Sequence, residues 1–138
     1  MTKMKEDIWQ SIQKLKFSNT FNEGEIFTYI KDEFFGILEK PNPNYPRTIE
    51  HIFDDCKMGA VAEMTLIRDF GFTRNPKRYH DLISPCGIET EVKAYRKCTT
   101  DSIDTAIERA RKWNKARVWI FFQFNNGAYT FYTLKEVK

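Results

Sequence analysis

The chain has 138 residues, a net charge of +3 and an apolar content of 41%. These values exclude a disordered chain and favour one domain, or a small core with an extension, whose mild positive charge is compatible with nucleic acid. Three cysteines without CxxC spacing and two histidines are a poor set for structural zinc, and they indicate a reduced, cytoplasmic protein. The sequence has no signal-peptide pattern and no apolar run that would span a bilayer, so we expect no membrane association.

Residues 1–58 are interpreted as an N-terminal helical extension with three amphipathic stretches, at 3–16, 23–35 and about 48–57. A proline-rich loop at 41–46 separates the last two stretches. The arrangement resembles a helix-turn-helix module, but the outward surface of the third stretch is acidic, which argues against major-groove binding. We therefore favour a helical cap or a dimerisation region, in which His51 is a surface histidine.

A fourth helix is predicted over residues 59–70, where Gly71 ends it. Glu63 lies on the apolar stripe of this helix, which should face the core, and burying a lone carboxylate is costly unless a partner neutralises it. Two interpretations stay open. Glu63 either lies at the edge of the stripe, against water or an arginine, or it reaches an acidic cluster further along the chain.

That acidic cluster is predicted around the turn signal Pro85-Cys86-Gly87, which two short apolar stretches flank. The second stretch alternates, so that Glu89, Glu91, Lys93 and Tyr95 share one face of a strand. A hairpin would place Asp81, from the first stretch, beside them. Carboxylate oxygens with an adjacent cation are the groups that Mg²⁺ chemistry on a phosphate requires.

The remaining elements complete a mixed α+β (α/β) pattern. A short strand is expected at 71–73, a helix from Thr100 or Asp101 to about residue 114, and a last strand at 129–134. Residues 116–124 are apolar on both faces, which predicts an inner strand covered from both sides. From residue 59 the order is therefore helix, three strands, helix and two strands, with a central mixed sheet flanked by helices.

The spacing of Asp81, nine residues and Glu91-Val92-Lys93, within this element order, resembles the PD-(D/E)xK nuclease superfamily. His80 stands where the superfamily usually has the proline of its motif. The resemblance covers about 80 residues. It implies a restriction-endonuclease-like core over residues 59–138, with the order α-β-β-β-α-β-β.

The resemblance also implies a function, a Mg²⁺-dependent endonuclease that hydrolyses phosphodiester bonds in DNA and in which Mn²⁺ substitutes for Mg²⁺. The implied catalytic residues are Asp81, Glu91, Lys93 and Glu63, because the superfamily often takes an acid from the helix before the first core strand. The metal would be held by Asp81, Glu91, the main-chain carbonyl of Val92 and Glu63. Contacts to nucleic acid are expected from Lys77, Arg78, Tyr95, Arg96 and Lys97.

The small size fits a phage-borne, resolvase-like or small restriction-type enzyme, acting as a homodimer in the cytoplasm, or in the host cytoplasm if a phage encodes it. Two alternatives remain. The first is an RNA endonuclease of the same chemistry, in which His51 becomes a metal ligand, as a helical histidine does in the related viral cap-snatching endonucleases. The second is a non-catalytic nucleic-acid-binding or assembly module on the same fold. Glu89 is interpreted as a rim residue rather than a ligand, and Lys93 as a group that orients or deprotonates the attacking water or neutralises transition-state charge.

Overall fold

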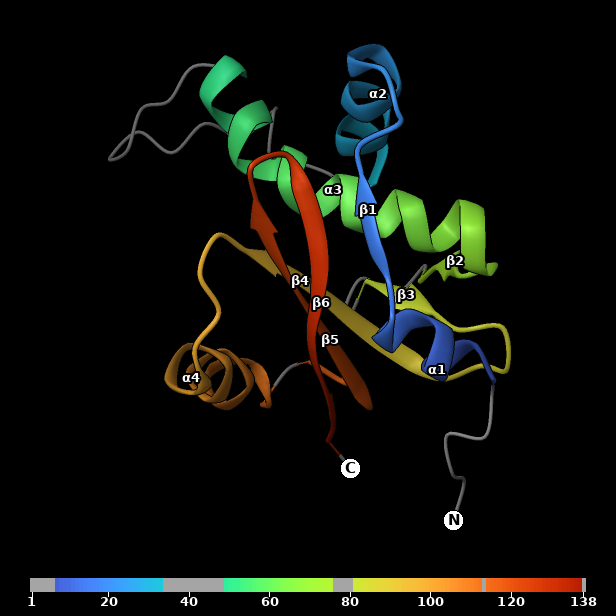
Figure 1. Cartoon of the computed structure of the whole chain (residues 1–138), viewed down its shortest axis with the longest axis vertical. Coiled ribbons are helices and arrows are strands. Elements are labelled where there is room, and N and C mark those ends of the chain that lie inside the picture. The colour runs from blue at the N-terminus through green and yellow to red at the C-terminus, as the bar shows by residue number, and fades with distance from the viewer. Residues whose placement is uncertain (1–6, 34–48, 76–80, 113, 138) are drawn as a thin grey trace.

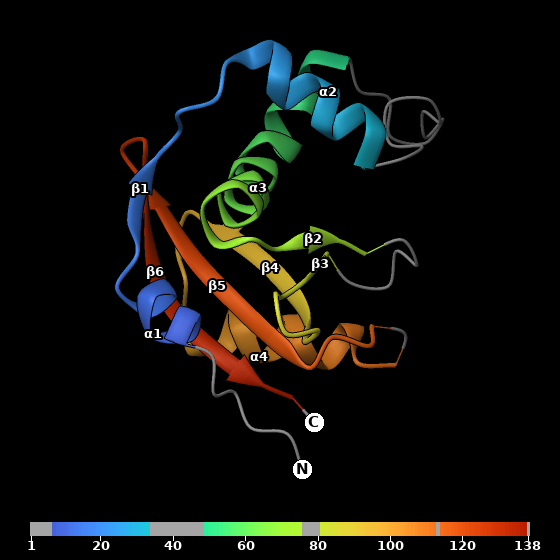
Figure 2. The same ribbon diagram turned by 90° about the vertical axis from the view of Figure 1, so that its right-hand side faces the viewer.

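The computed structural model describes residues 7–33, 49–75, 81–112 and 114–137. These residues form an α+β fold in which helices cover both faces of one six-stranded mixed sheet, with α2 and α3 on one side and α4 on the other (Figures 1 and 2). The elements are α1 (Asp7–Gln13), β1 (Lys16–Ser18), α2 (Glu23–Glu33), α3 (Ile49–Phe70), β2 (Thr73–Arg74), β3 (Leu82–Ile83), β4 (Glu89–Tyr95), α4 (Thr100–Ala110), β5 (Val118–Asn125) and β6 (Ala128–Glu136).

The strand order across the sheet is β1-β6-β5-β4-β3-β2, and only the β4–β5 pair is parallel among these strands. Helix α4 makes the crossover that a parallel pair requires. The prediction of an inner strand is confirmed at β5, where five residues in succession, 118–122, are buried. Burial from both sides explains why its sequence is continuously apolar.

Strand β4 divides its side chains between two cores, as the alternating sequence predicts. Val92 packs in the larger core beneath α3, whereas Tyr95 packs with Trp119 and Phe121 in the smaller core beneath α4. Because side chains alternate along a strand, Glu91 and Lys93 lie on the α4 side with Tyr95.

The predicted break between two helices near residue 58 is wrong, because α3 is continuous from Ile49 to Phe70. A glycine inside a helix costs about 1 kcal/mol relative to alanine, and for this reason Gly59 was predicted to separate two helices. A Cβ added at Gly59 would meet nothing within 4 Å, so the position is open and its glycine serves no close contact. The apolar face on either side of Gly59 packs against the sheet and offsets the local cost.

The helix predicted through residue 16 ends at Gln13, and Lys16–Ser18 forms β1 instead. Phe17 pairs with Tyr129 of β6, and the two rings stack with centroids 4.7 Å apart. Trp9 and Ile26 lie in the same core as Ile120. The described residues before α3 therefore share one core with the sheet.

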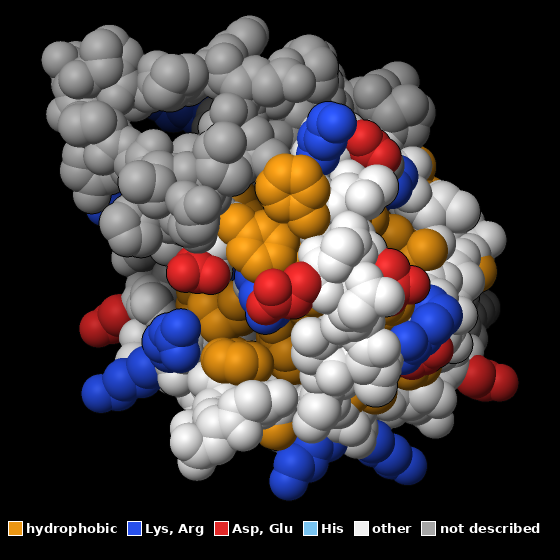
Figure 3. Space-filling model, turned by 90° about the horizontal axis from the view of Figure 1, so that it is seen from above, with side chains coloured by type: hydrophobic (Ala, Val, Ile, Leu, Met, Phe, Trp, Pro, Cys, Tyr) orange, Lys and Arg blue, Asp and Glu red, His pale blue; other side chains and the backbone are white. Residues whose placement is uncertain are grey.

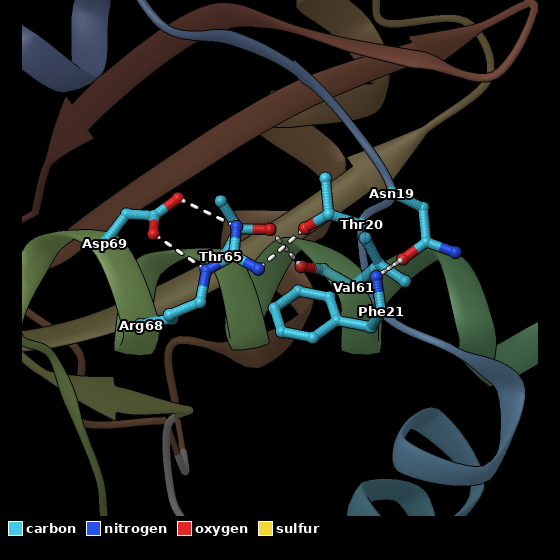
Figure 4. A network of polar contacts seen from close by, with 7 residues as sticks. All are labelled: Asn19, Thr20, Phe21, Val61, Thr65, Arg68 and Asp69. Carbon is cyan, nitrogen blue, oxygen red and sulfur yellow. Dashed lines mark hydrogen bonds and ion pairs between the residues drawn. The ribbon is translucent and has the colours of Figure 1, made fainter.

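Arg68 fastens the segment between β1 and α2 to the outer side of α3 (Figure 4). Its guanidinium donates to Thr20 Oγ1 at 2.6 Å, covers the Phe21 ring at 4.4 Å and pairs with Asp69 at 2.8 Å. The backbone N–H of Phe21 donates to the side chain of Asn19. These contacts fix the direction in which the chain enters α2.

Seen from above, hydrophobic side chains gather over α2 and α3 beside the residues that are not described (Figure 3). Phe27 of α2 is 38% exposed, and its ring lies 6.0 Å from that of Phe53 of α3. In the described part of the chain, no helix combines the length and apolarity needed to cross a membrane.

Candidate active site

A tight hairpin brings Asp81 beside Glu91. Leu82 pairs with Thr90 and Ile83 with Glu89, so the same register places Asp81, one residue before β3, opposite Glu91. The turn is closed by the Gly87 N–H, which donates to the Ser84 carbonyl at 2.8 Å. Gly87 has φ +93°, a conformation that residues with a Cβ rarely adopt.

The backbone of Val92 faces Asp81. The Val92 N–H donates to Asp81 Oδ2 at 3.0 Å, in the place where a longer β3 would supply a carbonyl. The Glu89 carbonyl, by contrast, accepts from the Arg117 N–H, which directs the odd-numbered backbone groups of β4 toward β5. Because both backbone groups of a strand residue point to the same neighbour, the Val92 carbonyl lies on the Asp81 side as well.

Glu91 and Lys93 form an ion pair on the α4 side of β4. Lys93 Nζ lies 3.4 Å from Glu91 Oε2, and the side chains are 38% and 8% exposed. Among the described residues, the buried Oε1 of Glu91 has no hydrogen-bond partner. The Asn114 side chain, just beyond α4, acts on the same carboxylate. Sequence reasoning missed Asn114, because its position depends on how the helix packs over the sheet.

Glu63 is 3% exposed and is held by residues from two other elements. The Tyr29 hydroxyl donates to Glu63 Oε1 at 2.7 Å, and Arg74 NH1 donates to the same oxygen at 2.5 Å. The charge of Asp81, from the predicted cluster, also acts on the Glu63 carboxyl. Glu63 therefore pairs with an arginine, as the first interpretation allowed, but it is buried and does not lie at a water-facing edge of the stripe.

The site holds more carboxyl groups than cations, and this excess raises the pKa values of the acids. The carboxyl groups belong to Glu63, Asp81 and Glu91, and the cations to Arg74 and Lys93. Burial and the Asp81 charge raise the pKa of Glu63 well above its usual range, and the same two causes raise the pKa of Glu91 to about 7. Burial also raises the pKa of Asp81, against the Val92 N–H and the charges of Lys93 and Arg74. Burial would lower the pKa of Lys93, but Glu91 and Asp81 together raise it. The cluster therefore favours any added positive charge.

The donors on β4 and before β3 fit a hard cation. Among the described residues, no three His, Cys, Asp or Glu side chains are grouped so that they could hold one ion. Asp81, Glu91 and the Val92 carbonyl remain as an oxygen set, and the partnerless Glu91 Oε1 is a lone pair that a cation would satisfy. Mg²⁺ is typically bound through one or two carboxylates while it keeps several waters, so this small set suits it.

Tyr95, Arg96 and Lys97 line a hollow of about 620 Å³ beside α4, together with Arg109. Tyr95 shares a face of β4 with Glu91 and Lys93, so the hollow begins one side chain beyond the ion pair. Glu89 instead lines a second hollow, of about 460 Å³, near the end of α4. Lys77, Arg78 and His80 lie outside the described residues, and the side chain of His51, on α3, is not described.

Comparisons of the chain with protein-family models, with curated proteins and with solved structures each give no match. The functional argument therefore depends on the geometry of the site itself.

Proposed function

We propose that the chain is a Mg²⁺-dependent endonuclease of the PD-(D/E)xK type that hydrolyses phosphodiester bonds in DNA. The observation that carries this proposal is the convergence of Glu63, Asp81, Glu91 and Lys93 from α3, the approach to β3, and β4. The element order supports it, because α3, β2, β3, β4, α4, β5 and β6 follow one another in the order that the superfamily core has. Charged strand residues alone occur by chance, whereas a cluster of three carboxyl groups, two of them buried, is a candidate functional site.

The residues divide the work of phosphodiester hydrolysis between them. A bound Mg²⁺ would polarise the scissile phosphate and lower the pKa of the attacking water. Asp81, Glu91 and the Val92 carbonyl would hold that cation, and the Asp81 carboxylate is itself fixed by the Val92 N–H. Lys93 lies 3.4 Å from Glu91, so it is placed to orient or deprotonate the attacking water or to neutralise charge that develops on the phosphate.

The hollow beside α4 is the proposed path of the substrate strand. Arg96, Lys97 and Arg109 line it with one acid, Asp101. Lysine and arginine contacts to phosphates are strong at low salt and carry no sequence information, which suits a strand held next to the cut site. Cutting both strands of a duplex requires two such sites, so the proposal includes a homodimer.

The test is cleavage of supercoiled plasmid, branched DNA and single-stranded RNA with Mg²⁺, Mn²⁺ or EDTA. The variants are Glu91→Gln and Lys93→Met, and Glu89→Gln is the matched control on the same face of β4. Metal-dependent cutting of DNA that is lost in the first two variants and kept in the control supports the proposal. Preference for RNA would replace DNA by RNA as substrate, and absence of cutting by a folded protein would favour a non-catalytic module.

A further inference from the structure

On the α4 side, the sheet continues across β6 and β1, beyond the core that the helix closes. That core takes its strand residues from β4 and β5, namely Tyr95, Trp119 and Phe121. Among the described residues, Val137 alone joins it from the chain after β5. The α4 side of β6 and β1, called the open face, therefore lies outside this core.

The register identifies the side chains on the open face. Trp119 and Gln123 point toward the α4 side of β5, because side chains alternate along a strand. Their partners share that face, so Lys135, opposite Trp119, and Thr130, opposite Gln123, lie on it as well. Lys16 of β1 pairs with Thr130 and extends the row. Lys16, Thr130 and Lys135 are all exposed, so the open face is polar and meets water.

A β-bulge adds an exposed aromatic ring to the open face. Phe121 pairs with Thr133 and Phe122 with Phe131, which leaves Tyr132 as the extra residue of β6. Phe131 packs in the larger core, so alternation directs Tyr132 to the α4 side, where it is 43% exposed. Bulges are common next to active sites, where they re-aim a side chain, and here the bulge presents a ring to solvent.

The open face also carries positive charge. Strands β1, β5 and β6 are described in full, and their one acid, Glu136, pairs with Val118 of the larger core, on the other side of the sheet. Lys16 and Lys135 remain on the open face, on either side of Tyr132 along β6. Aromatic rings in a positively charged groove bind single-stranded nucleic acid, because bases stack on the rings while phosphates meet the cations.

The open face adjoins the candidate active site. Lys93 pairs with Phe121, and Phe121 pairs with Thr133, the neighbour of Tyr132. Two strand spacings separate these positions, about 10 Å across the sheet. A base stacked on Tyr132 would therefore lie within a few nucleotides of a phosphate held at Lys93.

We propose that the open face binds a single-stranded segment of DNA, with a base stacked on Tyr132 and the flanking phosphates at Lys16 and Lys135. A base inside a duplex is already stacked and paired, so a side-chain ring does not reach its face. The inference rests on the proposed function, and it narrows the substrate to DNA with unpaired nucleotides beside the cut, such as a branched duplex or a duplex with a single-stranded arm.

The test compares a blunt duplex with the same duplex carrying a single-stranded thymidine arm, by fluorescence anisotropy in Ca²⁺, which prevents cutting. Wild type is expected to bind the armed duplex more tightly. Tyr132→Ala should weaken that binding roughly 5- to 150-fold, the range for one base on an aromatic side chain, and leave binding of the blunt duplex unchanged. Tyr132→Phe keeps the ring and should stay within about twofold of wild type. Phe27→Ala is the matched control, because Phe27 is the other large apolar side chain exposed among the described residues. Circular dichroism confirms that each variant is folded.

The inference would be overturned by equal affinity of wild type for both DNAs, or by wild-type affinity for the arm in folded Tyr132→Ala. An equal loss in Phe27→Ala, in Tyr132→Phe or on the blunt duplex would also overturn it, because the effect would then not come from stacking on this ring. Each of these results leaves the proposed nuclease to its own cleavage test. A wild type that binds the arm through Tyr132 but cuts neither DNA with Mg²⁺ would instead overturn the proposed function and leave a single-strand-binding face. Failure of wild type to bind either DNA would overturn both.

Discussion

Two carboxylate–cation pairs lie within one site, and they differ in how far water reaches them. Glu63 and Arg74 are 3% and 20% exposed, and Tyr29 bonds to both. Glu91 and Lys93 are 8% and 38% exposed, and one oxygen of Glu91 has no partner among the described residues. The Glu63–Arg74 pair is called the closed pair, and it contributes to stability and electrostatics. The Glu91–Lys93 pair is called the open pair, and its unused lone pair makes it available for chemistry. The comparison predicts that removing the cation has opposite consequences in the two pairs.

Arg74→Met breaks the closed pair and is expected to lower the free energy of unfolding by about 3–5 kcal/mol, because it leaves a buried carboxyl without its cation. Urea denaturation followed by circular dichroism measures this. The control is Arg68→Met, whose ion pair with Asp69 is about 45% exposed, so its loss is expected to cost less than the loss of the buried pair. Equal losses of unfolding free energy in the two variants would show that burial adds nothing to the contribution of the Glu63–Arg74 pair.

Lys93→Met breaks the open pair. Cleavage is expected to fall roughly 10²–10³-fold, the size typical for the loss of one group that stabilises transition-state charge. The free energy of unfolding is expected to fall less than in Arg74→Met, because the Lys93 side chain is 38% exposed. Single-turnover cleavage with saturating enzyme separates this effect from weaker binding. A Lys93→Met variant that is much less stable than wild type but cuts at the wild-type rate would reverse the assignment of the two pairs.

The carboxyl of the open pair also predicts how stability depends on pH. Burial and Asp81 raise the pKa of Glu91 from about 4.5 in the unfolded chain to about 7, so the folded protein binds the extra proton between these values. The contribution of Glu91 to the free energy of unfolding is therefore fully present below about pH 4.5. Up to about 3 kcal/mol of this contribution is lost as the pH rises through 7. Burial also raises the pKa of Glu63 and Asp81, which adds to the loss in the same direction.

Thermal unfolding between pH 4.5 and 8, in EDTA and with Mn²⁺, measures this dependence. Glu91→Gln should flatten the curve in EDTA, and Mn²⁺ should raise the midpoint at pH 8 more than at pH 5, because the ion replaces the proton. A wild-type protein whose midpoint rises with pH through this window would contradict the cause assigned to the shift.

The sequence allowed the open half of the site to be predicted better than the closed half. Alternation along Glu89–Tyr95, with a turn signal before it, is local information, and it correctly placed Glu91 and Lys93 on one face with Asp81 opposite. The apolar stripe of α3 left open whether Glu63 lies at its edge or reaches the cluster, and it could not name the partners. Tyr29 is 34 residues and Arg74 11 residues away in sequence, so tertiary packing alone brings them together.

The fold was predictable to a similar degree. Strand β5 and the element order follow from hydrophobic patterning, whereas two details depend on non-local contacts. β1 has three residues and exists because β6 offers it an edge, and α3 runs through Gly59 because apolar residues on both sides of that glycine pack against the core. Neither leaves a signal in the local sequence.

The smallest effect is expected in the hollow beside the open pair, where contacts are exposed and screened by salt. Lys97→Ala should weaken DNA binding by less than about tenfold at moderate salt and reduce the slope of log affinity against log salt by about 0.9, the value for one phosphate contact. Fluorescence anisotropy of a labelled duplex, with Ca²⁺ to prevent cutting, gives both numbers. Arg111→Ala is the matched control, because Arg111 lines the second hollow and pairs with Glu108. A slope that changes equally in both variants would show that α4 attracts DNA diffusely, and the strand path would then no longer be tied to the side of α4 that adjoins Lys93.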